Sequence, residues 1–325
     1  MMTLQNQSLR NILLLICLAV ISVQVTAATP ARFYWKTLTG TKAVPVIDMN
    51  MSGNVNLADP SYLVVPDGQF EAHITIAGFA QTFPLAERAA MVAVLFPMGN
   101  VTGEGTLRGN TFSETASGYG DPMIEFDINI IGPKAIKNIP EFIRYEPGFS
   151  LDLLVDVAIP IGEYDSAQSI NIGQNRWYGR IGAPIVWQIG PWISNQRTTL
   201  EFLPQVWVFG DNDNFSGRIL STEPIFELDA HLTHDFHKDL WGAFDLVWVT
   251  GGKATLDGVT GEALDMISAG FTLGYQINEN IQFTAGYSAS INDSDPTDLR
   301  MDTFMMTLAF GWHPLIDGMN RLESE

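Results

Sequence analysis

Two short runs place metal-ligand side chains close together. His231, His234 and His237 form an H-x-x-H-x-x-H run, and imidazole is the commonest metal ligand. On a strand, side chains three positions apart point to opposite faces, so His231 and His234 reach one ion only if the strand ends between them. The loop 211–214, Asp-Asn-Asp-Asn, carries oxygen ligands suited to calcium but lacks the rest of an EF-hand. We predict a histidine cluster near a turn and a solvated loop, with no metal and no cofactor.

Hydrolytic chemistry would need a nucleophile, a base within its reach and a group that orients the base. The chain contains serines and histidines, but it has no G-x-S-x-G run and no distinctive Ser/His spacing. The prediction is therefore a protein that is not an enzyme. Outer-membrane phospholipases are also twelve-stranded barrels, so lipid hydrolysis stays a minor alternative.

A larger set of charged residues lies within segments of alternating polarity. A charge that faces lipid costs roughly 2–4 kcal/mol for Lys or Arg at the midplane and less for acids. We therefore assign the more apolar face of each segment to the outside, and these charged side chains then point inward. The predicted lumen or ligand-lining residues are Glu71, His73, Glu125, Asp127, Asp152, Asp156, Arg180, Glu201, Glu227, Asp229, His231 and Asp245. This acidic interior is either functional, as a cation-tolerant passage or a binding cavity whose carboxylates orient a ligand, or it is an interior hydrogen-bonded plug.

The segments that carry these residues have the pattern of membrane strands. In 303–312 the large apolar residues occupy every second position, and 266–277 and 281–291 repeat the pattern. The segments run about ten to twelve residues, close to the nine to eleven of a tilted strand that crosses a bilayer. The sequence therefore predicts an all-β fold, a transmembrane antiparallel up-and-down β-barrel.

Turn signals and alternation together predict about twelve strands. They lie near 34–48, 69–81, 88–97, 122–132, 149–160, 177–188, 198–209, 224–235, 240–250, 266–277, 281–291 and 302–312. Short and long connections alternate, as periplasmic turns and outside loops do, and a short helix is expected within 135–144. The eight tryptophans fall near strand ends, which favours aromatic girdles over core positions.

Pro184 and Pro204 interrupt two neighbouring strands, and each removes a ladder donor. A pair of bulges is the favoured interpretation. A weakened wall, through which a hydrophobic substrate leaves sideways into the bilayer, is the alternative.

The N-terminus predicts export. Arg10, the apolar run 12–23 and the small residues before Ala28 are typical of a signal peptide, which we place at 1–27 and expect to be cleaved, leaving 28–325 as one barrel domain. Cys17, the single cysteine, lies inside this leader. The net charge of −19 argues against nucleic acid as a partner, and a content of 46% hydrophobic residues suits a barrel with acidic loops and lumen.

Three runs carry a family resemblance: Gly-Tyr-Gly-Asp-Pro at 118–122, Ile-Pro-Ile-Gly-Glu-Tyr-Asp at 159–165, and Asn-Ile-Gly-Gln-Asn-Arg-Trp at 171–177. With the run 211–217 and Pro224, they make the chain resemble the MetA-pathway of phenol degradation family, outer-membrane barrel proteins associated with aromatic-degradation genes. The glycines and Asp or Asn residues suit tight turns, so we expect these runs to fold loops over the mouth. The chain departs from the common aromatic last residue, because His313 to Glu325 follow Trp312.

The resemblance implies a transporter without naming its cargo. We predict a channel in the outer membrane of a Gram-negative cell, in contact with outer-membrane lipid, for uptake of small hydrophobic or aromatic molecules by diffusion through a site-lined lumen. A non-conducting structural or adhesion barrel is the competing class.

Overall fold

A computed structural model describes residues 29–55, 59, 61, 65, 67–107, 109–292 and 299–316. The predicted signal peptide lies outside the described residues. No helix in the described part of the chain is both long and apolar enough to cross a membrane.

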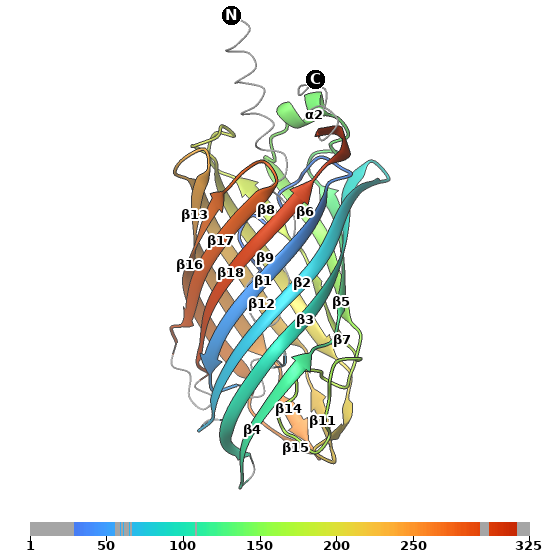
Figure 1. Ribbon diagram of the computed structural model, residues 1–325, viewed down its shortest axis with the longest axis vertical. Coiled ribbons are helices and arrows are strands. Elements are labelled where there is room, and N and C mark those ends of the chain that lie inside the picture. The colour runs from blue at the N-terminus through green and yellow to red at the C-terminus, as the bar shows by residue number, and fades with distance from the viewer. Residues whose placement is uncertain are drawn as a thin grey trace, which may run out of the picture.

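The described chain closes into the predicted antiparallel barrel of twelve strands (Figure 1). Closure joins the first strand to the last, with Lys42 opposite Trp312 and Gly53 opposite Met301. The wall consists of β1 (Lys42–Gly53), β2 (Gln69–Leu85), β3 (Arg88–Leu107), β5 (Met123–Ile131), β6 (Phe149–Ala158), β7 (Tyr178–Gly182) with β8 (Ile185–Gln188), β9 (Thr198–Phe209), β12 (Ile225–Asp235), β13 (Leu240–Gly251), β16 (Leu264–Gln276), β17 (Ile281–Ser290) and β18 (Met301–Trp312).

β7 and β8 form one wall strand that is interrupted at Pro184, because both segments pair with β6 and with β9. The backbone N–H of Ala183 donates to the carbonyl of Pro204 at 2.9 Å, and the N–H of Asp152 donates to the carbonyl of Pro184 at 2.8 Å. Because Gly182 pairs with Gln205 and Ile185 with Phe202, Pro204 lies opposite Ala183 and Pro184 lies opposite Leu203, one position away from each other in the register. Their carbonyls remain hydrogen-bonded. The register is the same on both sides of each proline, so the favoured interpretation, a pair of bulges, is wrong: the prolines interrupt the ladder without an inserted residue.

The two ends of the barrel differ. One end carries the short turns and α2 (Ile139–Ile143), the helix expected within 135–144; we call it the short-turn end. We call the other end the long-loop end. There β4 (Asn110–Tyr119) pairs antiparallel with the last part of β3. A small separate sheet at this end contains β10 (Asn212–Phe215), β11 (Arg218–Thr222), β14 (Ala254–Leu256) and β15 (Val259–Thr260).

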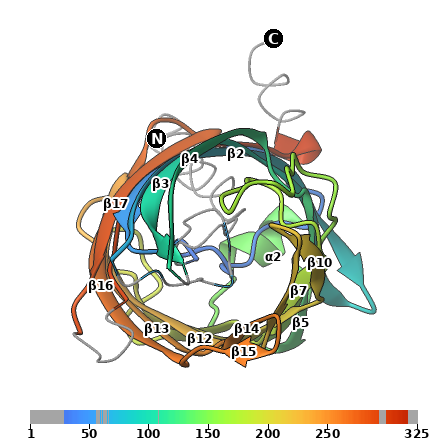
Figure 2. The ribbon, with the colours of Figure 1, turned by 90° about the horizontal axis from the view of Figure 1, so that it is seen from below.

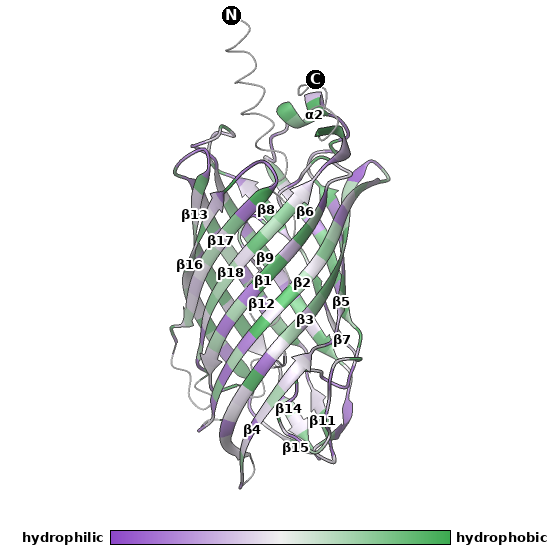
Figure 3. Ribbon diagram, in the orientation of Figure 1, coloured by the Kyte–Doolittle hydropathy of each residue, from purple (hydrophilic) through white to green (hydrophobic). Residues whose placement is uncertain are grey.

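Hydrophobic and hydrophilic residues alternate along the wall strands (Figure 3). Large apolar side chains such as Phe271, Leu273, Leu308 and Phe310 are exposed on the outside, where a bilayer would cover them. The girdle prediction holds for only some tryptophans. Trp177, Trp187 and Trp248 are exposed, whereas Trp35, Trp207 and Trp241 are buried.

The first predicted strand, 34–48, is wrong at its start. β1 begins at Lys42, and the preceding residues 29–41 lie inside the barrel, where Figure 2 shows the blue chain crossing the interior. Gly40, at φ +101°, lies in a turn that only glycine readily adopts. That turn leads the chain from the lumen into the wall. We call residues 29–41 the plug segment.

Candidate functional site

The plug segment is attached to the barrel wall through charged and polar side chains. The guanidinium of Arg32 pairs with Asp235 at 2.6 Å, and the ammonium of Lys36 contacts Asp152 and, at 3.5 Å, Asp127. Glu201 accepts hydrogen bonds from the Arg32 backbone N–H at 2.8 Å and from the Trp35 indole at 2.7 Å. Because buried charges are costly unless they are paired, these contacts seat the segment in one place.

Aromatic rings extend this anchor. The Arg32 guanidinium lies 4.3 Å from the ring centre of Trp35 and 4.4 Å from that of Trp241, and Arg197 lies 5.2 Å from Trp35. Guanidinium–aromatic contacts of this kind contribute about 0.5–2 kcal/mol each, more when they are desolvated. The buried tryptophans thus hold the plug segment in the lumen.

The lumen wall from β1 to β3 is apolar. Its inward side chains include Ile47, Met49, Ile74, Ile76 and Leu95, all at most 1% exposed. Phe33 and Tyr34 of the plug segment belong to the same buried cluster. Phe33 packs in the apolar cluster, whereas Trp35 donates to Glu201 and Tyr34 lies near Arg180 and Glu125 of the charged wall. The plug segment therefore contacts both the apolar and the charged wall.

The wall from β5 to β13 is charged. At its centre Arg180, 1% exposed, donates to Gln205 at 2.6 Å, contacts Asp156 and lies 3.4 Å from Glu125. Trp207 donates its indole N–H to Glu227 at 2.9 Å. Within the described lumen, nine buried carboxylates face four permanent cations: Arg32, Lys36, Arg180 and Arg197. The lumen is acidic, as predicted.

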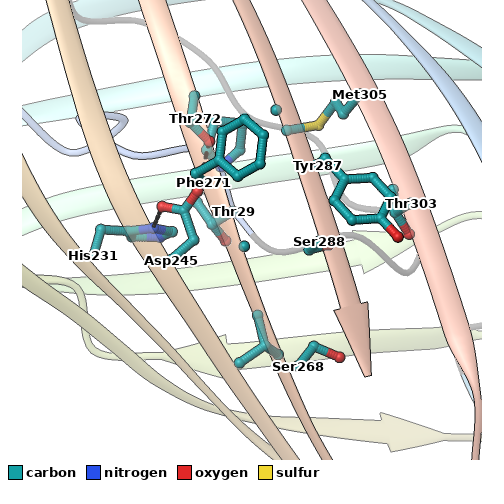
Figure 4. A pocket seen from close by; sticks show the side chains of 14 residues that line it. Thr29, His231, Asp245, Ser268, Phe271, Thr272, Tyr287, Ser288, Thr303 and Met305 are labelled. Atoms are coloured by element: carbon teal, nitrogen blue, oxygen red, sulfur yellow. Dashed lines mark hydrogen bonds and ion pairs between the residues drawn. The ribbon is translucent and has the colours of Figure 1, made fainter. Parts of the chain in front are cut away.

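The wall from β16 to β18 presents small side chains, and a cavity of about 30 Å³ lies between it and the plug segment (Figure 4). His231 and Asp245 form one side of the cavity with Nδ1 and Oδ1 2.6 Å apart, and the Thr272 hydroxyl donates to the other Asp245 oxygen at 2.6 Å. The Ser268 hydroxyl also lines the cavity but makes no hydrogen bond to His231. His231, Asp245 and Ser268 therefore do not form the nucleophile–base–orienter arrangement of a serine hydrolase.

Ten of the twelve predicted lumen residues are buried inside the barrel. They are Glu125, Asp127, Asp152, Asp156, Arg180, Glu201, Glu227, Asp229, His231 and Asp245. The plug segment or its neighbours bring most of them together, and their role toward a ligand stays a prediction.

The inward placement of Glu71 and His73 is wrong. Both side chains are exposed on the outer face of β2, where His73 contacts Asp48 at 2.8 Å, and the alternate residues Phe70, Ala72 and Ile74 are buried. The prediction assigned the more apolar face to the outside. That rule fails here because this part of the lumen is filled by an apolar core.

Sequence reasoning missed the plug residues Arg32, Trp35 and Lys36, and it missed Asp235. Asp235 continues the inward alternation of Glu227, Asp229 and His231 and follows from that pattern alone. No sequence pattern identifies the plug residues, because the prediction assigned 34–41 to the start of the first strand. His234 and His237, the other members of the histidine run, are exposed while His231 is buried.

The three loop runs meet at the long-loop end, around Asp121. Its carboxylate accepts hydrogen bonds from the backbone N–H groups of Gly162 and Gln174, both at 2.8 Å. Burial raises the pKa of Asp121 above its ordinary value, while these backbone donors act in the opposite direction. A side chain on Gly162 or Gly173 would lie within 2.8 Å of neighbouring backbone. The expectation that these runs fold loops is confirmed.

Removing the Asp121 carboxylate should loosen these loops. Asp121→Ala leaves two N–H groups without their acceptor, at about 1–3 kcal/mol for each one that stays buried. We expect faster cleavage within 159–177 when vesicles that carry the protein are treated with protease from the side of the long loops. The exposed Asp213 provides the control, and equal cleavage of Asp121→Ala and Asp213→Ala would contradict this role.

The closed barrel, its apolar outer face and its charged interior define an outer-membrane β-barrel protein. The family described as "Putative MetA-pathway of phenol degradation" matches residues 52–308, and the chain belongs to this family. Among solved structures, the COG4313 outer membrane channel from Pseudomonas putida F1 is similar, with a TM-score of 0.69 and 15% identity over 88% of this chain and 100% of that chain. A NanC porin has a TM-score of 0.45 and 10% identity over 82% and 98% of the two chains. No curated protein matches the sequence.

Proposed function

We propose that this protein is a channel of the outer membrane that admits small molecules, with hydrophobic or aromatic compounds as its main cargo. The long-loop end faces the outside and the short-turn end faces the periplasm. Passage is by diffusion, without a cofactor or covalent chemistry. Outer-membrane lipid surrounds the barrel.

The observation that supports this proposal best is how the lumen is filled. The segment in the lumen comes from before the first wall strand, and ion pairs hold it on one wall and aromatic packing on the other. Its last residues, Gly40 and Thr41, are hydrogen-bonded to Thr82 of β2, so the part that can leave the lumen lies before them. The apolar wall from β1 to β3 then offers a surface for hydrophobic solutes.

Family membership and the similar channel structure add support for a transport role. The acid-rich interior favours uncharged and cationic solutes over anions, because a narrow acidic passage raises the local concentration of positive charge. Phenol and toluene fit this description.

One observation favours a second function. The buried apolar cluster is continuous from the plug segment to the wall strands, which suits a structural barrel that conducts nothing. The two functions differ in whether the plug segment leaves its seat.

Uptake by vesicles tests both. Outer-membrane vesicles with and without the protein are given labelled phenol, toluene and a hydrophilic sugar. We expect faster entry of phenol and toluene and little change for the sugar. Equal acceleration of all three solutes would indicate a general pore, and no acceleration of any would favour the structural barrel. Release of fatty acid from phospholipid in the same vesicles tests the minor hydrolase alternative.

A further inference from the structure

Arg32 of the plug segment lies in a seat that two neighbouring wall strands form. Its guanidinium donates from Nη1 to Asp235 at 2.6 Å and from Nε to the Thr233 hydroxyl at 3.2 Å. The guanidinium also lies 4.4 Å from the centre of the Trp241 ring. Asp235 of β12 is directly opposite Trp241 of β13 in the strand register, and Thr233 is two positions from Asp235 on the same face. We call Thr233, Asp235 and Trp241, all at most 5% exposed, the Arg32 seat.

Gly274 allows the Trp241 ring to lie against the wall. It is opposite Trp241 in the register, and a Cβ atom on residue 274 would overlap the indole, so the ring lies over the backbone of β16. The other indole beside Arg32 is that of Trp35, which belongs to the plug segment. The wall therefore keeps one aromatic face for a cation when the plug segment leaves.

A chain of hydrogen bonds makes the Thr233 oxygen an acceptor. The carboxylate of Glu201 only accepts, so the Thr199 hydroxyl donates to it at 2.6 Å. Thr199 then accepts the 2.8 Å bond that it shares with Thr233. Since this bond uses the Thr233 hydrogen, the Thr233 oxygen is left to accept from the bound cation.

Arg197 keeps the Asp235 carboxylate in place. One Asp235 oxygen pairs with Arg32 and the other with Arg197, at 2.6 Å in each case. The carbonyl of Arg197, which directly precedes β9, also accepts from the Asp235 backbone N–H at 3.0 Å. Without Arg32, the seat offers a carboxylate oxygen, a hydroxyl oxygen and an aromatic face. All three attract a cation, and none of them donates a hydrogen bond.

Arg32 does not use all of its donors in this seat. Its Nη2 is buried and has no hydrogen-bond partner among the described residues, and a buried donor without an acceptor weakens a contact. The backbone explains the mismatch, because the Arg32 N–H is bonded to Glu201 at 2.8 Å and fixes where the side chain starts. A guanidinium compound that is not tied to the chain can turn until its donors are paired.

We propose that the Arg32 seat is a binding site for small organic cations of the guanidinium class, and that Arg32 occupies it while the plug segment is in place. Guanidinium is favoured over ammonium because its flat, delocalised cation both stacks on an indole and pairs with a carboxylate. The site rests on the proposed channel function in requiring that the plug segment leaves, and it adds a charged class of solute. A soluble guanidinium compound and Arg32 exclude each other.

Arg32→Ala empties the seat and leaves the wall unchanged. Calorimetry with the purified full chain in micelles measures binding of ethylguanidinium, of the uncharged analogue ethylurea and of ethylammonium. We expect ethylguanidinium to bind Arg32→Ala about tenfold or more tightly than it binds the wild type, and by a similar factor more tightly than ethylurea binds Arg32→Ala. Arg218→Ala, which removes a partly exposed arginine, should bind like the wild type. Arg32→Gln is a second variant with an emptied seat if Arg32→Ala does not fold.

Two wall substitutions added to Arg32→Ala locate the site. Asp235→Asn and Trp241→Leu should each weaken ethylguanidinium binding about fivefold or more. Asp265→Asn and Trp248→Leu are the matched controls, because Trp248 donates to Asp265 at 3.0 Å and both side chains are exposed. Neither control should change the binding.

Equal binding of ethylguanidinium and ethylurea to the emptied seat would overturn the site. Binding that survives both Asp235→Asn and Trp241→Leu, or that is equal in the wild type and Arg32→Ala, would also overturn it. Tighter binding of ethylammonium than of ethylguanidinium would reject the guanidinium class. The vesicle assay separates this result from the channel function: uptake of solutes without ethylguanidinium binding rejects the site alone, whereas selective binding without uptake of any solute rejects the channel alone.

Discussion

Replacing Lys36 by Met should open the barrel. Lys36 is a buried cation of the plug segment that contacts both Asp127 and Asp152. Without it, these two carboxylates stay buried without their cation while the segment is seated, whereas water can hydrate them once it leaves. Breaking a buried pair costs about 3–5 kcal/mol, which shifts the seated–released equilibrium by roughly two to three and a half orders of magnitude. Single-channel conductance in planar bilayers should rise severalfold, with more time spent in the open state.

The control is Lys134→Met, which removes the same charge from an exposed pair with Glu87 at the short-turn end. It should leave conductance unchanged, because exposed pairs contribute little. Adding Asp127→Asn and Asp152→Asn to Lys36→Met removes the buried negative charge and should restore most of the closed state. Identical conductance of Lys36→Met and Lys134→Met would mean that Lys36 does not hold the plug segment.

The strands were predictable because a membrane wall imposes one rule on each of them. Residues such as Phe304, Leu308 and Phe310 must face lipid while Thr303 and Thr307 face inward, so the alternation alone marks the element. The exception is the start of β1. The residues before Lys42 carry apolar and polar side chains much as a strand does, and local sequence does not distinguish a chain in the wall from a chain inside it.

The charged wall was predictable for a similar reason. Asp152, Arg180 and Asp229 lie between outward apolar neighbours, and lipid excludes charge. The plug contacts were not predictable, since they join residues far apart in sequence: Arg32 and Asp235 are 203 positions apart, and Lys36 and Asp152 are 116 apart. The sequence around one residue of such a pair does not identify its partner.

Glu71 and His73 are residues for which it is wrong to assign the more apolar face of a strand to the lipid. The inner face of β2 carries Phe70, Ala72 and Ile74 because it packs in the apolar cluster that Phe33 and Tyr34 join. The sequence of β2 shows that one of its faces is apolar. It does not show whether that face contacts lipid or packs inside the barrel. Deciding between lipid and an apolar lumen requires knowing what fills the barrel.

Replacing Arg180 by Met should destabilise the barrel more than any other change in the charged wall. Its guanidinium contacts Asp156, Glu125 and Gln205, and both acids have fully buried side chains. Removing the cation leaves two neighbouring carboxylates with no compensating charge, and the loss of one partner of a buried pair costs about 3–5 kcal/mol. Urea unfolding of the protein in micelles should show a lower free energy of unfolding by this amount.

The matched control for this change is Arg218→Met, because Arg218 makes a partly exposed pair with Asp257 at 3.7 Å. Its cost should stay below about 1 kcal/mol. Neutralising the acids together with the cation, as Arg180→Met with Glu125→Gln and Asp156→Asn, should recover much of the lost stability, because removing a whole buried charge network is often close to neutral. If Arg180→Met unfolded at the same urea concentration as Arg218→Met, the two acids would have to be held by other groups or neutral in the folded barrel. Recovery in the triple variant would instead locate the loss in the uncompensated charge, and would show that Arg180 maintains the acidic wall in which the plug segment is seated.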